Sequence, residues 1–260
     1  MESFASEANL AVLIDADNVP HSKVSYMLKE LAKYGNLTVK RIYGDWTKPT
    51  VAGWKSVLLE HAIQPIQQYS YTSGKNATDS AMIIDAMDLL YSGRVDGFCL
   101  ISSDSDFTRL ATRLREAGKK VIGMGERKTP QPFIVACDKF IYIEILEQPV
   151  ERIVVPKPAK SSGKTPVRVA VPALPPVPDE VVRMITEAVV ELSDEEGWAF
   201  LAEVGNLILR KQPDFDPRNY GYQKLTPLVE ASRKFVIEMR DAPKNRNVKL
   251  VYIRLKDSAR

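Results

Sequence analysis

Short, wholly apolar segments recur along the first 146 residues and alternate with longer amphipathic stretches. A strand that is apolar on both sides needs cover on both faces of its sheet, which parallel sheets obtain from flanking helices. This alternation therefore predicts an α/β fold, a three-layer sandwich with a mostly parallel sheet. The expected strands are Leu10–Ile14, Leu37–Tyr43, Ala62–Ile66, Gly97–Ile101, Val121–Met124 and Phe140–Leu146, and the expected helices are 22–34, 50–61, 77–91 and 106–117.

The pattern breaks at residues 149–178, which contain eight prolines and a Lys-Ser-Ser-Gly-Lys stretch. Such a segment favours an extended tether over a helix or a central strand. The chain therefore divides into a domain at 1–148, a linker at 149–178 and a second domain at 179–260.

The second domain restarts with regular helical periodicity. Three helices followed by a hairpin are typical of a winged helix, a variant of the helix-turn-helix. The expected helices are Asp179–Leu192, Trp198–Leu209 and Lys224–Ser232, and the expected strands are Phe235–Met239 and Val248–Leu255, joined by a basic loop, Arg240–Asn247.

Charge is unevenly distributed along the chain. Residues 204–260 contain 13 Lys and Arg against six Asp and Glu, and the linker is also basic. This excess favours an anionic partner for the C-terminal part, although a solvated basic surface would have the same composition.

Other features bear on cellular location. No apolar run reaches the ~18 residues of a membrane span, and the N-terminal residues lack the positive region of a signal peptide. Cys99 and Cys137 lie in apolar surroundings, so we expect two reduced thiols in a cytoplasmic protein without a membrane partner.

Four acidic residues occupy positions that suggest chemistry. Asp15 ends the first strand, Asp104 and Asp106 follow the strand Gly97–Ile101, and Asp79 opens a helix. Ligands of open α/β sheets bind outside the carboxyl ends of strands, so these carboxylates converge if the two strands are neighbours. Converging carboxylates repel one another unless a cation lies between them, and oxygen-only ligands favour Mg²⁺ or Mn²⁺. One ion or a pair of ions that clamps a phosphodiester would fit this pattern.

Each acidic residue also has a structural interpretation. Asp79 follows Asn76 as in a capping box, Asp104 would cap the helix that begins near Asp106, and Asp17 with Asn18 would form an Asx turn. Asp85 and Asp88 share the helix of Asp79, and Asp85 lies about 120° away from Asp79 around the helix axis, so we expect both to be surface or secondary residues.

Three segments resemble, in order, the NYN domains of the PIN-like nuclease superfamily, and most of all its LabA-like group. They are IDADN at 14–18, KNATDSAMIIDAM at 75–87 and CLISSDSDFTRLATRLREAGKKVIGMG at 99–125. The resemblance covers roughly residues 8–146 and implies a PIN-like sandwich, a Mg²⁺ or Mn²⁺ site and ribonuclease activity. By position it implies catalytic roles for Asp15, Asn18, Asp79, Asp104 and Asp106, with the four aspartates as metal ligands.

Residues 179–255 resemble the OST-HTH or LOTUS domain, chiefly through residues 197–232 with Tyr220-Gly221 and Lys224-Leu225. This resemblance implies binding of RNA, which we expect to be single-stranded, or of a protein partner; a homodimer is a further alternative. Candidate RNA contacts are the cations Lys75, Arg109, Lys224, Arg233, Lys234, Lys244 and Arg246.

Two competing functions remain open at this point. A non-catalytic RNA-binding regulatory protein would need only the basic C-terminal part and the linker. A phosphatase of the haloacid-dehalogenase type would use Asp15 as nucleophile and Asp17 as acid and base, and it would leave Asp79 without a catalytic role.

Overall fold

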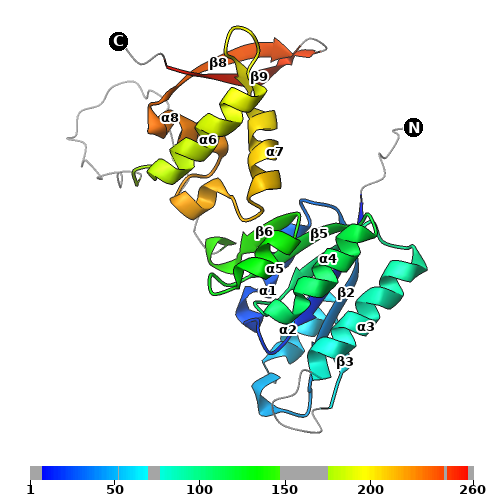
Figure 1. Ribbon diagram of the computed structural model, residues 1–260. Coiled ribbons are helices and arrows are strands. Elements are labelled where there is room, and N and C mark those ends of the chain that lie inside the picture. The colour runs from blue at the N-terminus through cyan, green and yellow to red at the C-terminus, as the bar shows by residue number, and fades with distance from the viewer. Residues whose placement is uncertain (1–7, 52, 70–76, 147–174, 243–244, 257–260) are drawn as a thin grey trace, which may run out of the picture. The chain divides into compact units, whose positions relative to one another are not determined.

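The structure is a computed structural model that describes residues 8–51, 53–69, 77–146, 175–242 and 245–256 (Figure 1). The chain divides into two compact units, Met1–Glu147 with Ala202–Asp216 and Gln148–Leu201 with Pro217–Arg260. Most of the expected linker lies outside the described residues, so the domain boundaries given above stay a prediction.

The first half of the chain forms a six-stranded sheet in the order β3-β2-β1-β4-β5-β6, in which every neighbouring pair is parallel. The predicted α/β class with a mostly parallel sheet is confirmed. The central strands β1 and β4 pair directly, with Ile14 opposite Ile101, so the residues that follow them emerge side by side. The strands are β1 (Asn9–Asp15), β2 (Asn36–Gly44), β3 (Gln64–Gln67), β4 (Gly97–Ile101), β5 (Lys120–Gly125) and β6 (Lys139–Tyr142).

Helices cover both faces of this sheet (Figure 1). Alternate residues of β1 point to opposite sides, as the pleat of a strand requires. Val12 and Ile14 belong to the core formed with α1 and α2, whereas Leu13 belongs to the core formed with α3, α4 and α5. The helices are α1 (Val24–Leu31), α2 (Trp54–His61), α3 (Ala77–Ser92), α4 (Thr108–Glu116) and α5 (Gln131–Ala136).

Several expected boundaries in this sheet domain differ from the structure. The apolar run after β6 turns into a short 3-10 helix, η4 (Ile143–Leu146), because its buried isoleucines fit either conformation and apolarity alone does not separate the two. Helix α5 was not expected, since its six residues are too few to show a helical period. Cys99 and Cys137 are free and buried, as predicted.

The second half of the chain contains helices and a three-stranded antiparallel sheet in the order β7-β9-β8. The helix expected at Asp179–Leu192 is present with these bounds, and its residues Val181, Ile185 and Val189 are buried. The elements are α6 (Asp179–Leu192), β7 (Ala199–Phe200), α7 (Leu201–Lys211), η5 (Pro217–Tyr220), α8 (Leu225–Ser232), β8 (Phe235–Ala242) and β9 (Asn245–Leu255).

Two expectations for this region are wrong. The stretch from Trp198 does not start a helix, because Ala199 and Phe200 form β7 and pair with β9. The expected basic loop 240–247 is mostly strand, since β8 runs to Ala242 and β9 starts at Asn245. Arg240 is therefore a strand residue rather than a loop residue. Within the described residues, no helix is both long and apolar enough to cross a bilayer.

Candidate active site

Asp15 lies at the carboxyl end of β1 and is only 1% exposed. One of its oxygens accepts a hydrogen bond from the backbone N–H of Asp17 at 3.1 Å. The other accepts from the side-chain amide of Asn18 at 2.6 Å and from the hydroxyl of Ser102 at 2.8 Å. Burial raises the pKa of Asp15, and the hydrogen bonds from Asn18 and Ser102 offset this only in part. Asn18, which was predicted as a site residue, thus contacts Asp15 directly.

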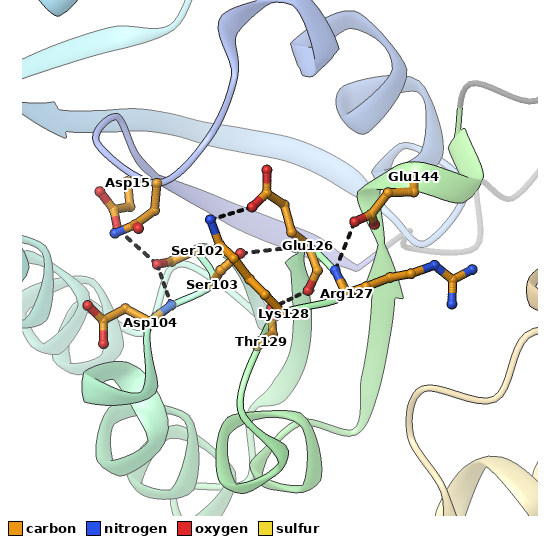
Figure 2. Close-up of polar contacts among 10 residues, drawn as sticks. Asp15, Ser102, Ser103, Asp104, Glu126, Arg127, Lys128, Thr129 and Glu144 are labelled. Atoms are coloured by element: carbon orange, nitrogen blue, oxygen red, sulfur yellow. Dashed lines mark hydrogen bonds and ion pairs between the residues drawn. The ribbon is translucent and has the colours of Figure 1, made fainter.

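Ser102 joins Asp15 to the second acidic segment (Figure 2). It follows β4 directly and is fully buried, and its hydroxyl accepts a hydrogen bond from the backbone N–H of Asp104 at 3.1 Å while donating to Asp15. The Asp104 carboxylate accepts from the N–H of Asp106 at 2.9 Å and so caps the 3-10 helix η3 (Ser105–Phe107). Capping therefore holds Asp104 in place without using all of its oxygen lone pairs.

Asp79 reaches the same place from the first turn of α3. One carboxylate oxygen each from Asp79, Asp104 and Asp106 lies within 4.8 Å of the others. Partial burial, followed by the charges of Asp15, Asp104 and Asp106, raises the pKa of Asp79 from 3.8 to about 6. The structure therefore brings together the four aspartates predicted from the sequence, with Asp15 as the buried member beside a more open group of three.

This donor set fits a hard divalent cation. Ligand oxygens lie about 2.1 Å from Mg²⁺, so two on opposite sides of the ion are about 4.2 Å apart. Oxygens of Asp79, Asp104 and Asp106 lie within 4.8 Å of one another, so at most a small contraction is needed to reach that value. Besides burial, the charges of the neighbouring aspartates raise the pKa of Asp79, so a cation at this place would relieve their repulsion.

The loop after β5 lies at the same edge of the sheet, which the sequence motifs do not indicate (Figure 2). The hydroxyl of Ser103 accepts a hydrogen bond from the N–H of Glu126 at 2.9 Å, and the Glu126 carboxylate pairs with Lys128 at 2.5 Å. Because β4 and β5 are neighbours, the serines after one strand meet the loop after the other. The signal available in the sequence was the Ser102-Ser103 pair directly after an apolar strand.

Asp85 holds α3 against the sheet. Its carboxylate accepts hydrogen bonds from the guanidinium of Arg41 and from the hydroxyl of Tyr43, both on β2. Tyr43 is fully buried, and its burial and the charge of Asp85 raise the pKa of the phenol. Asp85 is thus secondary to the acidic cluster, as expected, but it fastens the helix that carries Asp79. Asp88 is exposed.

The cations predicted to contact RNA lie on different elements of the chain. Arg109 is exposed on α4, one turn after Asp106, and Lys224, Arg233 and Lys234 are exposed at the two ends of α8. Lys75 and Lys244 lie outside the described residues, as does the side chain of Arg246. Asp17, on which the phosphatase alternative depends, is exposed.

Comparison with known proteins identifies both parts of the chain. The family model of the NYN domain matches residues 9–144, and that of the OST-HTH/LOTUS domain matches residues 174–248. An uncharacterised protein of Methanocaldococcus jannaschii is 25% identical over 123 residues, which are 46% of this chain and 48% of that protein. The chain thus spans about half the length of this curated relative.

Solved structures of uncharacterised bacterial proteins are also similar to parts of the chain. A crystal structure of a protein of unknown function from Vibrio parahaemolyticus is 21% identical, with a TM-score of 0.46, over 55% of this chain and 96% of its own. An uncharacterised protein from Nitrosomonas europaea, solved by NMR, is 35% identical, with a TM-score of 0.30, over 40% of this chain and 96% of its own.

Proposed function

Because the chain belongs to the NYN family, we propose that it is a metal-dependent ribonuclease that hydrolyses RNA phosphodiester bonds at its aspartate cluster. The NYN domain is a PIN-like nuclease domain, and the OST-HTH/LOTUS domain indicates RNA binding. The observation that supports the proposal best is the approach of Asp79, Asp104 and Asp106 to within 4.8 Å of one another, next to buried Asp15.

In this proposal, Asp79, Asp104 and Asp106 would hold Mg²⁺ or Mn²⁺, with Asp15 as a further ligand. A carboxylate has about four lone-pair sites, and Asp15 accepts three hydrogen bonds, so one site is left for a cation. When bound, the ion would polarise the phosphodiester and activate a water molecule.

The protein's own residues supply position and charge. Asn18 and Ser102 fix the orientation of Asp15, and Ser102 also fixes the backbone of Asp104. The four carboxylates create a negative potential that attracts a cation and disfavours bare RNA phosphate. Arg109, exposed one turn from Asp106, is a candidate to contact a neighbouring phosphate.

The test is cleavage of labelled single-stranded RNA and DNA by the full chain in Mn²⁺, Mg²⁺ or EDTA. We expect Mn²⁺-dependent cleavage of RNA by the unmodified protein. Loss of a residue that only supports a metal ligand lowers activity by about 10–100-fold. Asp104→Asn should lower the rate of cleavage by more than this, because it removes the charge of a ligand itself. Asp88→Asn, an exposed carboxylate on α3, is the matched control and should cleave normally. Retained cleavage by the Asp104→Asn protein would refute the proposed site.

Two results would point to the alternatives. RNA binding without any metal-dependent cleavage by the unmodified protein would favour the non-catalytic regulator. The phosphatase alternative predicts equal losses of activity from Asp15→Asn and Asp17→Asn, since both residues would react. Our proposal predicts a much smaller effect of Asp17→Asn, because Asp17 is exposed and contacts Asp15 through its backbone N–H.

A further inference from the structure

The three-stranded sheet of the C-terminal domain has one face that carries core residues and another face whose side chains are mostly partly exposed. Strand pairing places Phe200 opposite Tyr252, and Val236 opposite Arg254. Side chains alternate along a strand, so these residues share one face with Glu238 and Arg240. The opposite face contains the buried residues Ala199, Phe235 and Ile253, which are at most 4% exposed.

The other face carries aromatic rings and guanidinium groups in contact with one another. Trp198 is buried (8% exposed), whereas Phe200, Arg240, Tyr252 and Arg254 are partly exposed. The Cζ atom of Arg240 lies 4.4 Å from the ring centroid of Tyr252 and 4.9 Å from that of Trp198. The Cζ atom of Arg254 lies 4.8 Å from the Trp198 centroid. The rings of Phe200 and Tyr252 lie 5.5 Å apart with 35° between their planes. We call these five residues the arginine–aromatic face.

The backbone holds these groups in place. Gly197 has φ of +83°, and a Cβ built there would lie 3.3 Å from the Cδ atom of Arg254. The stem of Arg254 therefore passes close over a glycine, and its guanidinium donates to the carbonyl of Glu196 at 3.4 Å. The Arg240 guanidinium is paired with Glu238 at 2.9 Å, yet 34% of its side chain stays exposed. Such pre-ordered flat groups lose little entropy when a planar ligand stacks on them.

We propose that the arginine–aromatic face binds unpaired nucleobases of single-stranded RNA by stacking. Every base has a flat π surface that stacks on aromatic rings and on guanidinium planes. Because Glu238 neutralises part of the charge of Arg240, the face offers stacking surface more than phosphate contacts. The basic excess of residues 204–260 would supply the long-range attraction for the backbone. This inference rests on RNA being the ligand of the chain, as proposed above.

The test separates stacking from charge. RNA binding is measured with the full chain that carries Asp104→Asn, in EDTA, so that cleavage is prevented. The test variant carries Arg240→Lys and Arg254→Lys in addition. Lysine keeps each positive charge but lacks the planar guanidinium. Arg183→Lys, on α6 with its side chain 73% exposed, is the matched control. The probes are a short RNA that contains 2-aminopurine and the same RNA annealed to its complement, and thermal melting checks that each variant is folded.

We expect the double lysine variant to bind the single strand about tenfold more weakly, with less change in 2-aminopurine fluorescence. Affinity for the duplex should change less than twofold, and Arg183→Lys should change neither. Unchanged affinity for the single strand would overturn the inference and leave this face for a protein partner. An equal loss for single strand and duplex would also overturn it, because the face would then contact the backbone. Since binding is measured without cleavage, a protein that lacks nuclease activity could still confirm the stacking site.

Discussion

The burial of Asp79 and the repulsion from the neighbouring aspartates should make the metal-free protein more stable when Asp79 is neutral. Its pKa rises from 3.8 to about 6 in the folded state. A shift of that size corresponds to about 3 kcal/mol, since each pKa unit is about 1.4 kcal/mol. Asp79 is partly exposed, so screening by water reduces this to about 1–2 kcal/mol.

An opposing effect comes from the helix. Asp79 lies in the first turn of α3, where a negative charge is favourable by about 0.3–1 kcal/mol. The combined cost of burial and repulsion is larger than this favourable effect of the helix. We therefore expect Asp79→Asn to raise the free energy of unfolding at pH 7.5 in EDTA by about 1 kcal/mol, which is about 2–4 °C in Tm.

The change of stability with pH follows from the upward shift of the Asp79 pKa. The folded protein holds the Asp79 proton more tightly than the unfolded chain does, so the carboxylate lowers stability as pH rises from about 4 to 6. The advantage of Asp79→Asn should be near zero at pH 4, about half developed at pH 5 and complete above pH 7.

Metal should reverse the order of stability. A ligand present at 100 times its Kd stabilises the folded state by about 2.7 kcal/mol, and the Asn variant lacks one ligand charge. The assay is thermal and urea unfolding of both proteins in EDTA and in Mn²⁺ at several pH values, with Asp88→Asn as control. The reasoning fails if Asp79→Asn destabilises the metal-free protein at pH 7.5, or if its effect does not depend on pH.

Two further predictions concern the residues that position the cluster. Ser102→Ala removes the hydroxyl that donates to Asp15 and accepts from the Asp104 N–H. The Kd for Mn²⁺, measured by calorimetric titration, should therefore rise about 10–100-fold. Ser105→Ala, at an exposed position, should leave the Kd unchanged. An unaltered Kd in Ser102→Ala would show that these hydrogen bonds do not position the carboxylates. Asp85→Asn removes the counter-charge of Arg41, whose buried Nε already has no hydrogen-bond partner among the described residues. Urea unfolding should therefore show a loss of about 1.5–3 kcal/mol. A loss no larger than that of Asp88→Asn would contradict a fastening role for Asp85.

The architecture of the sheet domain could be predicted from the sequence because its signals are local. Apolar runs such as Leu10–Ile14 and Gly97–Ile101 need burial on both sides, and that requirement alone indicates a parallel sheet between helices. The short elements could not be predicted in this way. Helix α5 and strand β7 span too few residues to show a period, and they exist because of what they pack or pair against.

The sequence by itself determined where the four aspartates stand along the chain, since their positions after strands and at a helix start do not depend on distant contacts. Only the tertiary structure decided how they are held: Ser102 bridges Asp15 and Asp104 because β1 and β4 are neighbours. The same holds for Trp198, Arg240 and Arg254, which are separate in sequence and stack only because β7, β9 and β8 pair in that order. Strand pairing depends on the free energy of the whole sheet, so no local pattern contains it.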